Sequence, residues 1–505
     1  MKVNQLRAGT ILSYVNLAIG SIIPMIYTPV MLRILGQAEY GLYSLATSVT
    51  GYLSLLSFGL GSTIIRYVCK YKAEGNKEKV RSTFGLFILI YSIITALVVI
   101  GGVILSLCTD TFFSKGLTTE EIGKLKILIV LMAINTGIAF PFSVFSSIIT
   151  AYERFIFRRF IDIFGTVFGP VSNIILLYLG FGSIGMTIST LLFNLITLPI
   201  NIYYCCGKLH ITPIFRKPEK GFLKEIMGFS VFVFIGTIVD MLFWATDKVI
   251  LGALAGTTVV AVYNVGATFN NILQQLSQAV SGVIGPKINT MVTLDGDNKK
   301  ALTDVFIKVG RLQYLILALV VSGFIVFGQA FLFLWAGEKY AESYYIALLT
   351  MIPLVIPYIQ NTGLSIVIAQ NKHQFRSIVY LIIAILNAVS TYLVVPYWGG
   401  IGAAVCSCAS YLIGQGIIMN TYYKKVTGID IFLFWKNILK MSIVPSVLCV
   451  STIFISSYIN FYSWPVFLAG VLIYLALYVI LEWLVSMNDY EKDVIRVPLR
   501  KIIKR

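Results

Sequence analysis

The stretch FWATDKVILG, residues 243–252, ends an apolar run that begins near residue 227. A run of this length crosses about 30 Å of hydrocarbon as a helix, so it predicts a transmembrane span over 227–252. The stretch also places two opposite charges, Asp247 and Lys248, next to each other. A charged side chain at membrane depth costs about 3 kcal/mol or more. The pair therefore either marks the water interface or serves a function inside the membrane.

The composition of the whole chain is also that of a membrane protein. Of the 505 residues, 58% are hydrophobic and 12% are charged, and the mean hydropathy is +0.86. A soluble protein carries about 25% charged residues. The charges lie between apolar runs that are each long enough to cross a bilayer. These features predict an all-α polytopic membrane protein.

The basic residues between the runs indicate the orientation. Placing the N-terminus in the cytoplasm puts 32 Lys and Arg residues in inside segments and 6 in outside segments. This asymmetry predicts that both termini are cytoplasmic. It also accounts for the net charge of +17 without nucleic acid, because the basic loops face an anionic leaflet. About fourteen spans are predicted, over residues 10–33, 40–66, 83–107, 126–150, 161–179, 183–204, 227–252, 257–285, 312–334, 343–369, 378–396, 400–422, 438–458 and 464–486.

Weak self-similarity at a shift of about 214–220 residues indicates an internal repeat. YSLATSVTGYL (43–53) matches YNVGATFNNIL (263–273), and AYERFIFR (151–158) matches AQNKHQFR (369–376). The repeat unit has six spans, so the two halves share one orientation, with a pathway expected between them. The predicted domains are two pseudo-symmetric six-helix lobes, 1–208 and 209–425, followed by 426–505 with two extra spans and a basic cytoplasmic tail.

Three segments carry a resemblance to a known family. PVMLRILGQAEYGLYSLATSV (29–49), FGLGSTIIRY (58–67) and TDKVILGALAGTTVVAVYNVG (246–266) resemble the signatures of bacterial polysaccharide flippases. These are the Wzx-like O-antigen and capsule repeat-unit flippases of the multidrug/oligosaccharidyl-lipid/polysaccharide exporter superfamily. The resemblance implies a V-shaped, MATE-like transporter with a cationic central cavity.

The same resemblance implies a function. The chain would flip undecaprenyl-pyrophosphate-linked oligosaccharides across the bacterial cytoplasmic membrane by alternating access, for lipopolysaccharide or capsule biosynthesis. Its partners would be the lipid-linked glycan, membrane lipids and, loosely, polymerase and chain-length proteins. A lipid II flippase and a cation-coupled multidrug antiporter of the same superfamily remain open. Twelve spans would favour the antiporter, and fourteen favour the polysaccharide branch.

An enzyme of another class, a polytopic glycan polymerase or ligase, is the remaining alternative. Such enzymes carry a large exterior loop with catalytic residues, whereas the longest outside loop predicted here is about 108–125. No catalytic pairing of residue types at one depth is evident, so we expect no enzymatic activity. The sequence lacks a P-loop, and its two histidines lie in separate polar loops. We therefore expect no cofactor and no metal site.

A polar stripe precedes the charged pair. Gly236, Thr237, Asp240, Trp244 and Asp247 are spaced by one, three, four and three residues, which places them on one face of a helix. Intramembrane carboxylates usually face protein or a water-filled cavity. Asp240 and Asp247 are therefore candidates for coupling to a proton or sodium gradient, and Asp240, deeper in the span, is the stronger one. The alternatives are a structural hydrogen bond for Asp240 and an interfacial position for Asp247.

Candidate substrate contacts divide by chemistry. Arg33, Arg66 and Lys248 are cations that could attract a pyrophosphate, and Arg does so with a bidentate fork. Arg33 and Lys248 occupy matching repeat positions, in LRILG and KVILG. Each cation could instead anchor its helix at the membrane surface, or could simply belong to the excess of Lys and Arg on the cytoplasmic side. Candidate sugar contacts are the aromatic and amide side chains Trp244, Asn270 and Asn271.

Overall fold

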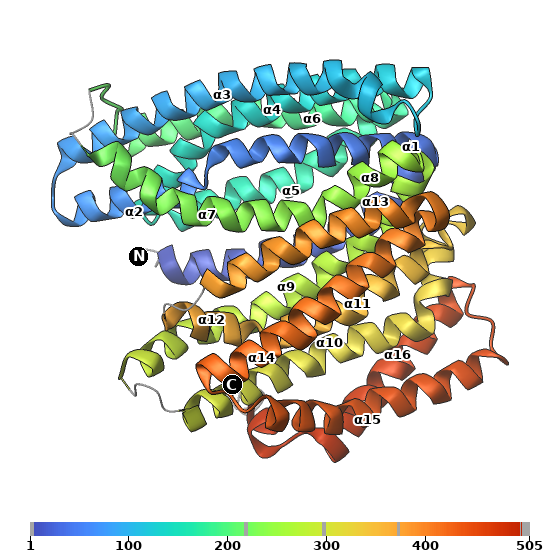
Figure 1. The fold of residues 1–505 in the computed structure, drawn as a ribbon. Helices are drawn as coiled ribbons and strands as arrows, with labels where there is room; N and C mark the ends of the chain where they lie inside the picture. Colours follow the sequence, from blue (N-terminus) through green and yellow to red (C-terminus); the bar gives the residue numbers. More distant parts are fainter. Residues whose placement is uncertain (1–4, 217–220, 295–298, 371–373, 495, 497–505) are drawn as a thin grey trace. The chain divides into compact units, whose positions relative to one another are not determined.

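The computed structural model describes residues 5–216, 221–294, 299–370, 374–494 and 496 (Figure 1). The predicted basic C-terminal tail lies partly outside the described residues. Every regular element within these ranges is helical. The elements are α1 Gln5–Gly51, η1 Tyr52–Ser57, α2 Leu60–Ala73, α3 Lys77–Phe113, α4 Thr119–Ala151, α5 Phe155–Tyr178, α6 Gly182–Tyr203, η2 Tyr204–Lys208, α7 Phe222–Trp244, α8 Thr246–Leu254, α9 Thr257–Leu294, α10 Lys299–Trp335, η3 Glu338–Tyr340, α11 Ser343–Ile359, α12 Asn361–Ala369, α13 Gln374–Tyr411, η4 Leu412–Met419, α14 Asn420–Tyr422, η5 Tyr423–Thr427, α15 Ile431–Ser456, α16 Trp464–Leu481 and η6 Glu482–Ser486.

The helices confirm an all-α polytopic membrane protein. Within the described ranges, nine helices are long and apolar enough to cross a membrane, and the number is ten if α11 and α12, bent by 42°, are counted as one broken span. Each predicted span overlaps a helix, although the number fourteen stays a prediction. Two helices, α1 and α13, join two predicted spans each across a break in helical geometry, at Gly36 (φ 74°) and Gly399 (φ 53°). Glycine occupies both breaks because it adopts positive φ without a steric penalty.

The chain forms two compact units, Met1–Ala261 and Val262–Arg505, called unit 1 and unit 2 below. Unit 1 contains α1 to α8 and the first residues of α9, and unit 2 contains the rest. The sequence placed α7 and α8 in the second lobe. Here α7 contacts α2 and η1, and α8 contacts α1 and α3, so both belong to unit 1 by their packing. The lobe boundary at residue 208 stays a prediction.

Aromatic side chains form much of the core of unit 1, where α3 and α4 run side by side (Figure 1). Phe84, Phe87 and Tyr91 repeat at helical spacing on α3 and are all buried. Phe84 meets Phe145 of α4 edge to face at 5.2 Å, and Tyr91 stacks on Phe140 at 5.7 Å. Each such side chain contributes about 2–3 kcal/mol through burial. The helical spacing of these residues therefore gives α3 one aromatic face that packs on α4.

Unit 2 has a separate aromatic cluster between α10, α15 and α16. Phe327 of α10 lies edge-on to Phe461 at 5.1 Å and to Tyr474 at 5.7 Å. Val444 and Leu448 of α15 complete the cluster. The two C-terminal helices are thus packed onto α10 by a buried apolar interface.

Close backbone approaches fix α8 and the start of α9 within unit 1. A Cβ atom at Gly41 of α1 would lie 1.8 Å from the Thr257 carbonyl oxygen, and one at Gly116 would lie 2.3 Å from the Gly252 carbonyl oxygen. Thr257 Oγ1 also donates to Glu121 Oε1 at 2.6 Å. Glu121 is at the same time the third residue of the capping box that begins α4. Only residues without a side chain allow these backbones to approach so closely.

We expect Gly41→Ala to destabilise the protein by about 1–3 kcal/mol or more, because its methyl group would overlap the Thr257 carbonyl. Gly61→Ala is the matched control, since nothing lies within 4 Å of a Cβ atom at that helical position. Thermal unfolding of the purified variants in detergent measures both. Equal Tm values for the two variants would show that α1 and α9 do not approach as described.

Candidate functional site

The charged pair lies at a break between two helices. α7 ends at Trp244, Ala245 has φ −109° and ψ −33°, and α8 begins at Thr246. The helix predicted over 227–252 is therefore interrupted at Ala245, whereas the span itself stays a prediction. Thr and Asp are favoured at helix N-termini, where a carboxylate also complements the helix dipole. Asp247 occupies the first turn of α8, where its charge complements the helix dipole, although no side chain caps the helix there.

Asp247 is an interior residue of unit 1. Its exposed fraction is 1%, and it interacts electrostatically with Lys248 and with Tyr52 of η1. The Tyr52 hydroxyl and the Thr246 hydroxyl share a hydrogen bond of 2.6 Å, which joins η1 to α8. Asp240, by contrast, is exposed on α7. The break thus separates the two carboxylates that the sequence placed on one stripe, and their roles in ion coupling stay predictions.

The three candidate cations lie on three helices of unit 1. Arg33 is exposed on α1, three residues before the break at Gly36, and Arg66 is exposed on α2. Lys248 is half-buried in the first turn of α8. A shared pyrophosphate contact by these residues stays a prediction.

The three candidate sugar contacts are in different surroundings. Trp244 is half-buried at the last position of α7, in unit 1. Asn270, in unit 2, is 3% exposed, and its Oδ1 accepts a hydrogen bond from Thr350 Oγ1 at 3.2 Å. This bond joins α9 to α11. Asn271 is exposed on α9. The amide of Asn270 thus has a structural partner, whereas Asn271 faces outward.

Unit 1 contains a polar pocket of about 270 Å³ between α1, η1, α4 and α6. All of its lining residues except Gly51 and Met132 carry a hydroxyl or an amide, and no charged side chain lines it. Thr47 and Thr50 donate to carbonyl oxygens of their own helix, at 2.9 and 2.7 Å, which leaves hydroxyl lone pairs free to accept. The lining residues are Tyr43, Thr47, Thr50, Gly51, Ser54, Met132, Asn135, Thr136, Thr187 and Thr190.

The sequence contained a signal for this pocket. Tyr43, Thr47, Thr50 and Ser54 are spaced by four, three and four residues, so they form a hydroxyl stripe on one helical face inside an apolar span. The stripe carries no charge, and weakly polar hydroxyls alter hydropathy little. Intramembrane charges are the more evident signal, and this stripe has none.

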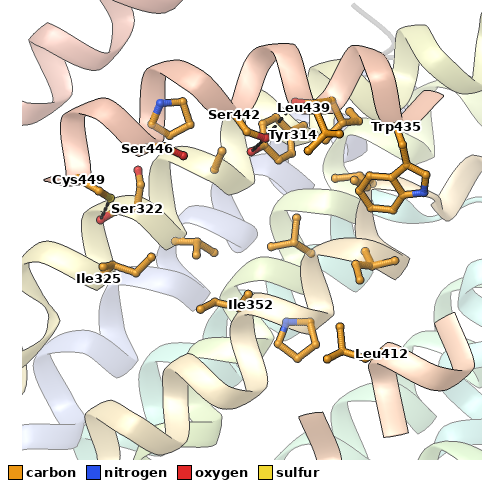
Figure 2. Close-up of a pocket in the computed structure, with 18 of the residues that line it drawn as sticks. Tyr314, Ser322, Ile325, Ile352, Leu412, Trp435, Leu439, Ser442, Ser446 and Cys449 are labelled. Atoms are coloured by element: carbon orange, nitrogen blue, oxygen red, sulfur yellow. Dashed lines mark hydrogen bonds between the residues drawn. The ribbon is translucent and has the colours of Figure 1, made fainter. Parts of the chain in front are cut away.

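Unit 2 contains an apolar groove of about 520 Å³ between α10, α11, η4 and α15. Figure 2 shows Trp435 at one end and Cys449 beside Ser322 at the other. Tyr314 and Ser442 hydrogen-bond to each other at 2.5 Å, and Cys449 Sγ donates to the Ser322 carbonyl at 3.4 Å. These polar groups are occupied by hydrogen bonds within the protein. The surface that remains available to a ligand is therefore apolar. Ile352, Leu412, Leu439 and Val450 also line the groove and are exposed.

Two named proteins are similar to this chain in sequence. An uncharacterized membrane protein of Methanocaldococcus jannaschii is 24% identical, with 91% of each chain covered. A candidate O-antigen transporter of Shigella flexneri is 20% identical, covering 79% of this chain and 92% of that protein.

Solved structures agree in fold. The lipid II flippase MurJ in an inward closed conformation matches with TM-score 0.73 and 16% identity, over 96% of this chain and 99% of that chain. An inward-facing MATE family multidrug transporter of the MOP superfamily matches with TM-score 0.62 and 16% identity, over 82% of this chain and 99% of that one. Residues 6–291, more than half of the chain, match the family model described as polysaccharide biosynthesis protein. With this match and a helical membrane fold common to flippases and exporters, the chain belongs to the polysaccharide biosynthesis protein family.

Proposed function

We propose that the chain flips lipid-pyrophosphate-linked oligosaccharide repeat units across the cytoplasmic membrane by alternating access, for cell-surface polysaccharide biosynthesis. The observation that carries this proposal is the polar pocket of unit 1, with neutral hydroxyl and amide groups inside a bundle of membrane-crossing helices. Such groups suit the hydroxyls of a neutral sugar, because their oxygen atoms can still accept hydrogen bonds from a ligand. The O-antigen transporter and lipid II flippase among the similar proteins support the same substrate class.

The apolar groove of unit 2 suits the other end of such a substrate. Its lining is almost entirely aliphatic and aromatic, and its exposed residues suit a bilayer. Burying a polyprenyl tail there would contribute about 0.8 kcal/mol per methylene relative to water, although the tail already avoids water in lipid. We therefore assign the groove a guiding role, holding the tail while the headgroup crosses.

The pyrophosphate is the part that all such substrates share, and we assign it to Arg66. We expect Arg66→Ala to reduce surface display of two different repeat units to a similar extent, and Arg66→Lys to restore display only partly, because lysine lacks the bidentate fork. Lys70→Ala, an exposed cation one turn further along α2, is the control and should have little effect. Loss of one glycan with the other unchanged would exclude a role for Arg66 at the shared group.

The protein is a multi-pass membrane protein, and we propose that it resides in the bacterial cytoplasmic membrane with both termini inside. Cys69 is exposed and lies on the predicted inner side, whereas Cys205 is buried and unsuited to labelling. In a variant that keeps only Cys69, we expect a membrane-impermeant maleimide to react only after the inner membrane is opened. Ser114→Cys, exposed in the predicted outer loop, should react in intact cells. Labelling of Cys69 in intact cells, with no labelling of Ser114→Cys, would show the opposite orientation.

Coupling of transport to a proton or sodium gradient, through Asp240 and Asp247, is part of the proposal. Collapsing each gradient in turn with an ionophore, while display of new surface glycan is followed, would identify the coupling ion or show that neither is needed. No enzymatic step is proposed, in line with the transporters and flippases named among the similar proteins.

A lipid II flippase is the second candidate, favoured by the fold likeness to MurJ over 96% of the chain. Rescue of a strain depleted of its lipid II flippase, without rescue of a repeat-unit flippase deletion, would select this alternative.

A further inference from the structure

A buried ion pair joins α10 to the segment after η6 in unit 2. Arg311 Nε donates to Glu491 Oε1 at 2.5 Å, and Arg311 Nη2 donates to Glu491 Oε2 at 3.0 Å. The two residues are 6% and 1% exposed. Arg311 Nη2 also donates to the Ser486 carbonyl at 2.8 Å, and Nη1 donates to Asn437 Oδ1 at 3.5 Å. The guanidinium is thus occupied by a bidentate carboxylate, a backbone carbonyl and an amide.

A second carboxylate, Glu482, lies beside this pair. Its exposed fraction is 0%, and neither of its carboxylate oxygens accepts a hydrogen bond. Ser486 Oγ, four residues further along the π-helical turn η6, is also buried without a hydrogen-bond partner. Arg311 attracts the Glu482 carboxylate, Glu491 repels it, and the neutral hydroxyls of Ser486 and Tyr478 lie close enough to interact with it. Two carboxylates therefore share one guanidinium, and the fully ionised cluster carries a formal charge of −1.

The surrounding groups do not supply the missing positive charge. Tyr478 donates its hydroxyl hydrogen to the Leu315 carbonyl at 2.9 Å, and the Tyr314 hydroxyl is bonded to Ser442. Within the described ranges, the only cation found next to Glu482 is Arg311, which is already paired. The groups that interact with Glu482 are Arg311 and Tyr314 from α10, Tyr478 from α16, Ser486 from η6 and Glu491 from the segment after η6. Asn437 and Ser442 of α15 contact this group indirectly, through their hydrogen bonds to Arg311 and Tyr314.

An ionised carboxylate removed from water needs a compensating charge or donors. We propose that Glu482 binds a small monovalent cation, H⁺ or Na⁺, and that the Ser486 hydroxyl is the second ligand. Both ions neutralise the carboxylate, and oxygen atoms are the ligands that a hard cation prefers. π-Helical turns are rare and often occur at functional sites. This site is in unit 2, separate from Asp240 and Asp247, and it does not depend on the proposed substrate.

Because the cation would neutralise a carboxylate that is buried only in the folded state, it should stabilise the folded protein by mass action. The experiment follows the Tm of the purified full-length protein in detergent. One arm titrates NaCl against choline chloride at constant ionic strength, and the other varies pH from 6 to 8.5 without Na⁺. If Na⁺ is the ligand, Tm should rise saturably with Na⁺. If H⁺ is the ligand, Tm should rise as pH falls, because the folded state then holds the extra proton.

Glu482→Gln is the decisive variant, since it keeps the shape and removes the charge. It should lose the ion-dependent rise and should match or exceed the wild-type Tm at pH 8.5. Asp489→Asn, which removes an exposed carboxylate seven residues away, should retain the wild-type response. A response in Glu482→Gln equal to that of wild type would overturn the proposal, as would a wild type that responds to neither ion. If Glu482→Gln does not fold, Glu482→Asp should shift the midpoint of the response, and an unchanged midpoint would overturn the proposal.

Discussion

Arg311→Ala is expected to remove most of the folded protein from the membrane. Breaking a buried ion pair costs about 3–5 kcal/mol, because the remaining charge is left without a partner. Here two carboxylates, Glu491 and Glu482, would remain in a buried site without the guanidinium that they share. The loss approaches the whole stability of a typical domain, so both the membrane level and the Tm should fall.

Two further variants make this result interpretable. Lys308→Ala, at an exposed position one turn earlier on α10, is the control and should cost little. Arg311→Met combined with Glu491→Leu should recover part of the loss, because replacing a buried pair by apolar residues is often close to neutral. If Arg311→Ala is as stable as Lys308→Ala, the ion pair does not hold the C-terminal segment in place.

Thr190→Trp is expected to lower transport on the order of tenfold or more while leaving the protein level unchanged. Thr190 lines the polar pocket and is exposed, so an indole ring there fills the pocket without displacing core side chains. A tenfold loss corresponds to about 1.4 kcal/mol of lost substrate interaction. Surface glycan display in a flippase-deletion host measures transport, and immunoblotting of membranes measures the protein level.

Leu192→Trp is the matched control for this variant. It adds the same ring to the same helix, two residues away, at an exposed apolar position outside the pocket. We expect normal display from Leu192→Trp. If the two variants display equal amounts of surface glycan, the pocket is not part of the transport pathway.

Hydropathy was sufficient to predict the helices but not their ends. The predicted span 83–107 corresponds to α3 at Lys77–Phe113, and 312–334 corresponds to α10 at Lys299–Trp335. Hydropathy detects only the apolar part of each helix, whereas the charged turns beyond it remain helical. α4 begins at Thr119, seven residues before its predicted span, because the Thr118–Glu121 capping box supplies hydrogen bonds to the first turn.

The site could be predicted only in part, for two physical reasons. Neutral hydroxyls such as Thr47 and Thr50 barely change hydropathy, so the polar pocket became evident only when three helices brought such residues together. The residues of the buried ion pair, Arg311 and Glu491, are 180 positions apart, and each lies near the end of an apolar run. A charge in that position is ordinarily interpreted as an interfacial marker, and only the fold shows that both are buried.

Transport of a lipid-linked glycan by the purified protein tests the central claim most directly. The protein would be reconstituted into liposomes that carry a fluorescent undecaprenyl-pyrophosphate-linked oligosaccharide, and arrival of the glycan at the opposite leaflet would be followed with a membrane-impermeant quencher. We expect the wild type and Leu192→Trp to accelerate this movement well above protein-free liposomes, and Thr190→Trp to approach the protein-free rate. A folded wild-type protein that leaves the rate at the protein-free value for every lipid-linked glycan supplied, under both a proton and a sodium gradient, would contradict the proposed function.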